Sequence, residues 1–285
     1  MITGKAKLAG VIGWPISHSR SPQLHNSWLQ ALDLDGAYVP LAVAPDNLSA
    51  AVTGLRAAGF AGLNVTIPHK EAAFALATET TARAQAMGAA NTLVFTENGI
   101  LADNTDGYGF LQNLLAARPN WSAKTGPAMI LGAGGAARAV VGALAEAGCP
   151  QLRLVNRSRD RAAALVEDLS ARMTLPPVEI MGWADAPDRM QDCALLVNSS
   201  SLGMTGQPDL SLSLAKLPRT AVVTDLVYVP LETTLLATAR ARGNPVVDGL
   251  GMLLHQGRPG FKAWFGVDPK VTEELRAAVL QDGAG

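Results

Sequence analysis

The stretch "AMILGAGGAARAV", Ala128–Val140, joins an apolar run to a glycine-rich turn and then to a helical pattern. Gly132, Gly134 and Ala137 form a GxGxxA arrangement, in which the first glycine allows a tight bend and the second lets the backbone approach a ligand. The alanine permits close packing of the helix. A helix that begins here offers free N–H groups and its positive end to a pyrophosphate. The pattern favours a dinucleotide-binding unit, although a plain strand-to-helix turn would look similar.

The next apolar run, "LRLVN", indicates which dinucleotide is bound. An NAD-binding unit carries an acidic residue about twenty residues after the turn, where it binds the ribose 2′-hydroxyl. Here the run ends instead in Asn156, Arg157 and Ser158, and Arg159 and Arg161 follow. Guanidinium groups and a hydroxyl suit a 2′-phosphate. The sequence therefore predicts NADP; the alternative is that the arginines form only the solvated start of a helix.

Short β-type runs alternate with longer helical runs, which predicts an α/β fold with a parallel sheet covered by helices. In the first part we expect strands in "LAGVIG", "AYVPLAV", "GLNVTI", "NTLVFT" and "GILADN", and helices after Ser21, Pro45 and Thr81. The segment "DGYGFLQNLLAARPN" is typical of a linking helix that stops before Pro119. A boundary near Asp106 follows, with one domain over residues 1–105 and a Rossmann-type domain over 106–249.

Composition excludes several classes of protein. The 285 residues are 48% hydrophobic and 16% charged, which is typical of a globular chain. A net charge of −1 offers no basic surface for nucleic acid, so we expect a small-molecule partner. Cys149 and Cys193 form no CxxC pair, and no run approaches the about 20 apolar residues of a membrane span. We therefore expect an unanchored protein of a reducing cytoplasm.

The histidines offer no metal site. None of the four pairs at the spacing of two zinc ligands with a glutamate between them, and we expect local hydrogen bonds from them instead. They are His18, His25, His69 and His255.

Several loops follow strand ends, where ligands collect in open α/β sheets. They read "GWPISHSRSPQLHN", "NVTIPHK", "GAANT", "DNTDGYGF", "NSSSLGM", "DLVYVP" and "DGLGMLLHQG". Together and in this order they resemble the shikimate dehydrogenase family over nearly the whole chain. The most specific parts are HSxSPxxHN, NVTxPxK and NTDxxGF.

The resemblance implies an NADP-dependent oxidoreductase that interconverts 3-dehydroshikimate and shikimate, on the route to aromatic amino acids and chorismate. It also implies two α/β domains with a cleft between them. The substrate domain would be completed by C-terminal helices over 250–285, and the Rossmann domain would bind NADP.

Residue by residue, the resemblance implies that Lys70 and Asp106 form the catalytic pair. The substrate-binding residues would be Ser19 and Ser21 for the carboxylate, Thr66, Asn91 and Gln256 for ring hydroxyls, and also Asp106 and Tyr228. The cofactor-binding residues would be Gly132, Ala133, Gly134, Gly135, Ala136, Asn156, Arg157, Ser158, Arg161, Ser200, Met204, Gly249 and Met252, with the two methionines beside the nicotinamide. Structural alternatives exist: Ser21 could cap a helix, Asn91 could close a turn, and Lys70 could merely pair with Asp106.

Two departures from the family pattern keep the groups that it needs. Ser158 stands where threonine is commonest in the family. The stretch "NSSSLGM" replaces the usual motif, and its Ser200 can supply the hydroxyl of the family's threonine.

Two alternative functions remain open. A quinate or dual-specificity dehydrogenase would share every loop, and a non-catalytic NADP-sensing regulator would have a damaged catalytic pair. Lys70 and Asp106 are both present, which favours an enzyme. We expect it to act as a monomer or homodimer.

Overall fold

The computed structural model describes residues 2–281 and divides into two compact units. The first unit runs up to Thr105 and resumes at Leu253, and the second runs from Asp106 to Met252. The chain passes back from the second unit to the first inside helix α9 (Leu250–Phe265). No helix within 2–281 is long and apolar enough to span a membrane.

The first unit is built on a six-stranded sheet in the order β2-β1-β3-β5-β6-β4. Its elements before α9 are β1 (Lys7–Gly13), α1 (Ser21–Ala31), β2 (Gly36–Ala42), α2 (Leu48–Ala57), β3 (Phe60–Val65), α3 (Lys70–Ala75), β4 (Glu79–Thr80), α4 (Ala82–Met87), β5 (Thr92–Thr96) and β6 (Gly99–Asp103). The five expected strands and three expected helices are confirmed, while α3 and β4 were not expected. After α9 comes α10 (Glu273–Gln281).

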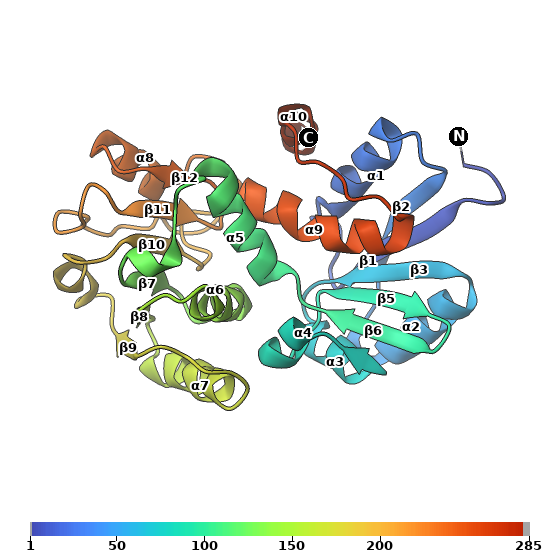
Figure 1. Cartoon of the computed structure of the whole chain (residues 1–285), viewed down its shortest axis with the longest axis horizontal. Helices are drawn as coiled ribbons and strands as arrows, with labels where there is room; N and C mark the ends of the chain where they lie inside the picture. The colour runs from blue at the N-terminus through green and yellow to red at the C-terminus, as the bar shows by residue number, and fades with distance from the viewer. Residues whose placement is uncertain (1, 282–285) are drawn as a thin grey trace. The chain divides into compact units, whose positions relative to one another are not determined.

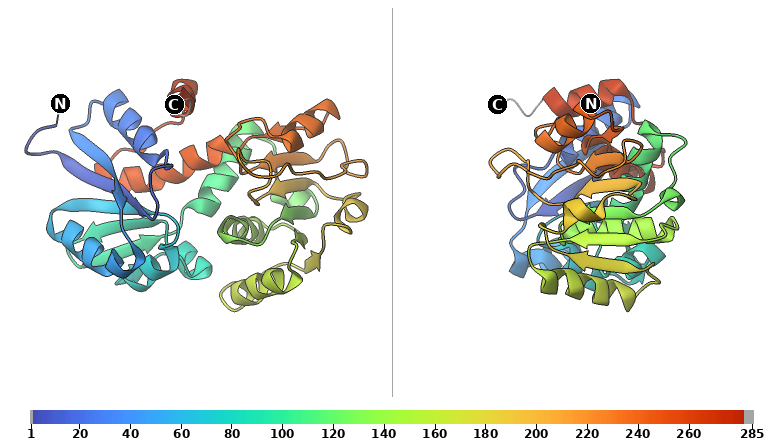
Figure 2. Two further views of the ribbon diagram at one scale, coloured as in Figure 1. Left: turned by 180° about the vertical axis from the view of Figure 1, so that it is seen from behind. Right: turned by 90° about the vertical axis from the view of Figure 1, so that its left-hand side faces the viewer.

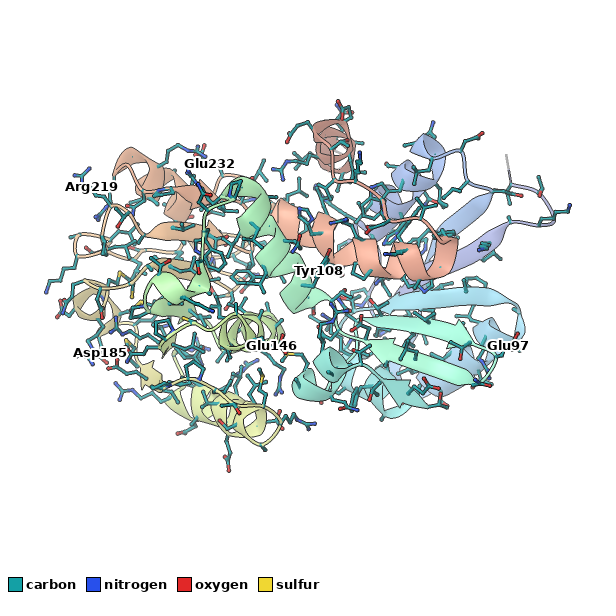
Figure 3. All side chains as sticks on the ribbon, viewed as in Figure 1. Glu97, Tyr108, Glu146, Asp185, Arg219 and Glu232 are labelled. Atoms are coloured by element: carbon teal, nitrogen blue, oxygen red, sulfur yellow. The ribbon has the colours of Figure 1, made fainter. Side chains whose placement is uncertain are left out.

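The sheet of the first unit is mixed, which the strand and helix alternation did not predict. Strand β5 runs antiparallel to both β3 and β6. The reason is local: Thr96 pairs with Gly99, so only two residues separate the strands, too few for the crossover that a parallel pair needs. Glu97, labelled in Figure 3, is in this tight turn. Gly99 has φ +145°, which suits glycine.

The second unit has a fully parallel sheet in the order β12-β11-β10-β7-β8-β9. Its elements are α5 (Asp106–Ala117), β7 (Ala128–Leu131), α6 (Gly135–Glu146), β8 (Leu152–Val155), α7 (Arg159–Ser170), β9 (Val178–Met181), β10 (Leu195–Asn198), β11 (Val222–Asp225), α8 (Thr234–Ala241) and β12 (Val246–Val247), followed by the start of α9 (Figure 1). Strands β7, β8, β10 and β11 are buried along their whole length, as expected for a parallel sheet covered on both faces. The predicted Rossmann-type unit is therefore confirmed.

The order of the strands reverses at β7. This strand pairs with β8 on one side and β10 on the other. The chain runs outward from β7 through β8 to β9, and then crosses back to β10 on the opposite side of β7. Such a reversal opens a crevice at the carboxyl ends of the strands, where ligands bind in open α/β sheets. The glycine turn after β7 stands at this point.

Aromatic side chains fix α9 against the sheet of the first unit. The indole Nε1 of Trp264 donates to the Leu93 carbonyl oxygen at 3.0 Å, and Phe261 packs edge-on against Trp28 of α1. A Cβ at Gly62 would overlap the Trp264 indole, so this close approach requires glycine. Figures 1 and 2 both draw α9 beside the N-terminal strands. The position of α9 matters because the helix carries Gln256.

His25 lies at the centre of this aromatic cluster and is fully buried. Its ring stacks on Tyr38, with centroids 4.1 Å apart and planes 4° from parallel. Burial disfavours the imidazolium form and lowers the pKa of His25 from 6.5 to about 3, against a smaller opposing effect of Asn64. The ring is therefore neutral in the folded protein at neutral pH.

We predict that acid destabilises the first unit through His25. The unfolded chain binds a proton near pH 6.5 and the folded chain only near pH 3, so the stabilisation present above pH 6.5 is lost as the pH falls toward 3. The loss is about 1.4 kcal/mol per pH unit, or roughly 2 kcal/mol between pH 6.5 and 5. His25→Phe keeps an aromatic ring and removes the proton site. Urea unfolding at both pH values should show a smaller decline in the variant; equal declines would contradict the prediction.

Candidate functional site

The glycine turn after β7 has the geometry of a phosphate cradle. Gly132 has φ +108°, a backbone conformation that favours glycine, and a Cβ there would make a tight contact of 3.2 Å with the Ser200 amide nitrogen. Gly134 is the N-cap of α6, and because glycine has no side chain, no side-chain oxygen of the N-cap occupies the first N–H groups of the helix. A Cβ on Gly135 would meet nothing within 4 Å, so the start of the helix is open. The free N–H groups and positive end of this helix fit a pyrophosphate.

Ala137 is fully buried, which allows α6 to pack closely on the sheet as predicted. Of the other residues in the turn, Ala133 is buried and Ala136 is exposed.

The segment after β8 lies against this turn. Ser158 is the N-cap of α7 and accepts a hydrogen bond from the Arg161 amide at 3.2 Å. The Arg161 Nε donates to the Ala133 carbonyl oxygen at 3.1 Å, which places this guanidinium beside the glycine turn. Asn156 donates from Nδ2 to the Ser158 carbonyl oxygen at 2.8 Å and so shapes the bend. Arg157 is exposed beside it.

Arg159 faces a different partner. Its guanidinium pairs with Asp185 at 2.8 Å. Asp185, which is labelled in Figure 3, lies in the segment after β9. The interpretation of these arginines as a solvated helix start therefore fits Arg159, whereas Arg161 is engaged at the turn.

The remaining predicted cofactor residues lie after β10 and around the start of α9. Ser200 donates from Oγ to Asn198 Oδ1 at 2.7 Å, next to Gly132. Met204 is 40% exposed in the loop that follows, and Met252 is half-buried in α9. A Cβ at Gly249 would lie 2.5 Å from the Leu226 backbone, so Gly249 permits close packing there.

Asn91 is the centre of a buried hydrogen-bond network in the first unit. Its Nδ2 donates to Thr105 Oγ1 at 3.0 Å and to Gln256 Oε1 at 3.1 Å. Its Oδ1 accepts from the Thr105 amide at 2.9 Å and from Thr92 Oγ1 at 3.0 Å. Thr105 Oγ1 also donates to the Gln256 carbonyl oxygen at 2.8 Å. The network brings together Asn91 and Gln256, both of which were predicted to bind ring hydroxyls of the substrate. Asn91 therefore does more than close a turn.

The loop before α1 brings Ser19 and Ser21 together. The Ser21 amide donates to Ser19 Oγ at 3.4 Å, and Ser21 is buried. Capping of the helix by Ser21 was wrong: the N-cap is Arg20, and no side chain caps this end. The reason is that Ser21 already stands inside the first turn, one residue before Pro22, which is favoured at a helix start.

The "NVTIPHK" loop places Thr66 and Lys70 at the end of β3. The Thr66 amide donates to the Ile12 carbonyl oxygen at 3.0 Å, which binds the loop to β1. His69 is buried with its Nε2 2.8 Å from the Val43 carbonyl oxygen, which confirms the local role expected for this histidine. Lys70 is half-buried at the first residue of α3.

The two predicted catalytic residues belong to different units. Lys70 is in the first unit, and Asp106 is the first residue of α5 in the second. Tyr228 is half-buried in the second unit, in the segment after β11. Residues 2–281 contain no cluster of three or more His, Cys, Asp or Glu side chains that could hold a metal, and Cys149 and Cys193 are free thiols.

Sequence reasoning missed buried polar residues that support these loops. Asn64 accepts from Tyr38 Oη at 2.6 Å and donates to the Asn91 carbonyl oxygen at 3.1 Å. Asn198 and Asp225 end neighbouring strands and are fully buried. All three stand inside motifs noted in the sequence, and a polar residue in an apolar strand run was the available signal.

Comparison with known proteins follows the same division of the chain. A family profile described as "Shikimate dehydrogenase substrate binding domain" matches residues 11–93, "Shikimate / quinate 5-dehydrogenase" matches 115–195, and "Shikimate 5'-dehydrogenase C-terminal domain" matches 249–280. A curated relative, shikimate dehydrogenase (NADP(+)) of Rhodospirillum rubrum, is 60% identical over 281 residues, covering 98% of this chain and 99% of the relative.

Two solved structures are similar over nearly their whole length. Shikimate 5-dehydrogenase of Thermus thermophilus, in complex with NADP(H) and shikimate, is 35% identical with a TM-score of 0.83, covering 96% of this chain and 99% of that one. Quinate dehydrogenase of Corynebacterium glutamicum, in complex with NAD, is 30% identical with a TM-score of 0.89, covering 97% of this chain and 99% of that one.

The two glycines of the turn should respond differently to substitution. Gly134→Ala is compatible with the extended backbone there, so the melting temperature should stay close to that of the parent while the methyl group obstructs the cradle and weakens NADP+ binding about tenfold or more. Gly132→Ala places a side chain at φ +108° and should lower the melting temperature. Calorimetry of NADP+ binding and thermal unfolding measure both effects. Unchanged NADP+ affinity in Gly134→Ala would contradict a phosphate cradle.

Proposed function

The chain belongs to the shikimate dehydrogenase family, and from that premise we propose that it is the NADP-dependent enzyme that reversibly reduces 3-dehydroshikimate to shikimate. The observation that carries the proposal is 60% identity to a shikimate dehydrogenase (NADP(+)) along essentially the full length of both chains. Such an enzyme is an oxidoreductase acting on a CH–OH group, in the biosynthesis of aromatic amino acids.

NADPH, when bound, supplies the hydride for this reduction, and the protein must hold the substrate and provide a proton. We assign proton donation at the substrate carbonyl oxygen to the Lys70 ammonium, with Asp106 as its partner in the catalytic pair. Ser19 and Ser21 would bind the substrate carboxylate, and their proximity supports this. Lys70 at the start of α3 is held by a backbone bond from the Ala90 amide to its carbonyl oxygen, at 2.9 Å.

The ring hydroxyls of the substrate would meet Thr66, Asn91 and Gln256, with Tyr228 also near the substrate. The bond between Asn91 Nδ2 and Gln256 Oε1 supports this assignment, because it orients two amides before any ligand arrives. On this proposal the first unit binds the substrate and the second binds NADP through the glycine turn, the segment Asn156–Arg161, and the loops of Ser200 and Met204.

The comparisons favour shikimate over quinate. The relatives that are 50–60% identical are named shikimate dehydrogenase (NADP(+)), whereas the quinate dehydrogenase is 30% identical and was crystallised with NAD. We also propose a cytoplasmic enzyme that works as a monomer or homodimer; its biosynthetic role and free cysteines fit that location.

Cofactor choice should depend on Arg157 and Arg161. Each charge-assisted contact to the 2′-phosphate contributes about 1.5 to 3 kcal/mol, so the preference for NADP+ over NAD+ should fall by about 10² to 10⁴ in the double variant Arg157→Ala, Arg161→Ala. The ratio of kcat/KM for the two cofactors measures this. Arg159→Ala is the matched control, since Arg159 pairs with Asp185. The assignment fails if the control changes the ratio as much as the double variant does.

Lys70→Met should separate a proton donor from a structural ion pair. Methionine keeps the bulk of the side chain but has no proton to give, so kcat should fall by about 10² to 10⁴ while shikimate affinity and melting temperature change little. Lys216→Met, which removes an exposed pair with Asp188, serves as the control and should leave kcat unchanged. A Lys70→Met protein that keeps more than about a tenth of parental kcat would show that Lys70 is not the donor.

A further inference from the structure

A buried side-chain bond joins the carboxyl ends of two neighbouring strands in the second unit. Asn198 ends β10 and Asp225 ends β11, and the two residues stand opposite each other in the parallel register. Both are fully buried, and Asn198 Nδ2 donates to Asp225 Oδ1 at 2.9 Å. The loops that leave these strands are the ones that carry Met204 and Tyr228.

The Asn198 amide makes three further hydrogen bonds, all to the first loop. Its Oδ1 accepts from the Ser200 amide at 3.1 Å and from Ser200 Oγ at 2.7 Å, and its Nδ2 also donates to the Leu202 carbonyl oxygen at 3.0 Å. Two donors and two acceptor sites are thus in use. The Asn198 side chain thus holds the loop between β10 and Met204 at both Ser200 and Leu202.

The Asp225 carboxylate holds the second loop in the same way. Its Oδ1 also accepts from the Val227 amide at 3.0 Å, and its Oδ2 accepts from Thr233 Oγ1 at 2.7 Å. Burial raises the pKa of Asp225, and these hydrogen bonds oppose that shift. A backbone bond from the Thr205 amide to the Val229 carbonyl oxygen, at 2.9 Å, joins the two loops again further out.

We propose that Asn198 and Asp225 are positioning residues that fix the two loops on the nicotinamide side of the cofactor in a single arrangement. They act through the backbone of Ser200–Leu202 and Val227, and they touch neither ligand. The proposal rests on the proposed function, since it takes Met204 and Tyr228 as neighbours of nicotinamide and substrate. The glycine turn and Arg161 would hold the other half of the cofactor without their help.

The test compares NADP+ with 2′-phospho-ADP-ribose, which lacks the nicotinamide ring. In Asp225→Ala, calorimetry should show about tenfold weaker NADP+ binding and less than about a twofold change for the fragment, because only NADP+ reaches the displaced loops. Asp225→Asn should keep most of the NADP+ affinity that Asp225→Ala loses. Its side-chain oxygen can still accept from Asn198 and Val227, while its side-chain NH2 donates to the Thr233 hydroxyl. Thr233→Val removes the hydroxyl that donates to Asp225 and accepts from the Leu236 amide at the start of α8, with little change of shape. It should shift the ratio in the same direction if Asp225→Ala fails to fold.

Asn244→Ala is the matched control for lost stability. Asn244 is also buried, and its Nδ2 donates to the carbonyl oxygens of Pro218 and Ala221 at the opposite end of β11. It should lower the melting temperature without changing the affinity ratio. The proposal is overturned if NADP+ and the fragment weaken equally in Asp225→Ala, if neither weakens in that variant, or if Asn244→Ala changes the ratio as much. A parent that binds NADP+ but does not reduce 3-dehydroshikimate would refute the proposed function, and the affinity ratio would still decide this proposal.

Discussion

The side-chain amide of Asn91 is the interaction on which the first unit's site depends. It connects the start of β5 to Thr105, the last residue before the chain enters the second unit, and to Gln256, four residues after Met252, where the chain leaves it. The amide is buried, and an unpaired polar group in such a setting costs about 1 to 3 kcal/mol. Alternative positions of these three segments would leave several such groups unpaired, so one arrangement is strongly favoured.

The same physical solution recurs in the second unit, where Asn198 holds the loop after β10. In both places a short amide replaces water as the partner of loop backbone groups. The loops thereby gain a defined shape without becoming part of a helix or strand. Preorganised loops suit a polyhydroxylated ligand, because ordering flexible groups on binding would cost affinity.

The sequence predicted those features that depend on local backbone chemistry. The GxGxxA turn, the strand before it and the start of α6 follow from glycine conformation and apolar runs alone. The mixed sheet of the first unit did not follow from the alternation of strands and helices, because pairing direction here depends on the two residues between Thr96 and Gly99, which are too few for a parallel crossover. Helix α3 was missed because its six residues after Pro68 give too short a pattern.

The buried polar residues that support the loops of the candidate site were not predicted from the sequence. Several of their contacts join residues that are distant in sequence: Thr233 and Asp225 are 8 positions apart, and Asn64 and Tyr38 are 26 apart. Hydrophobic periodicity does not indicate such long-range contacts, whereas the motif loops can be recognised from their composition. Capping by Ser21 failed for a related reason, since the choice of the first helical residue is decided by where Pro22 fits.

The most direct test of the account is the initial rate of oxidation of shikimate and of quinate by the purified protein, each with NADP+ and with NAD+. The account predicts that shikimate with NADP+ has the highest kcat/KM, by about 10² or more over shikimate with NAD+, from two charge-assisted contacts to the 2′-phosphate. Quinate should be slower with either cofactor. A kcat/KM for quinate equal to or above that for shikimate, or no turnover of shikimate at all, would contradict it.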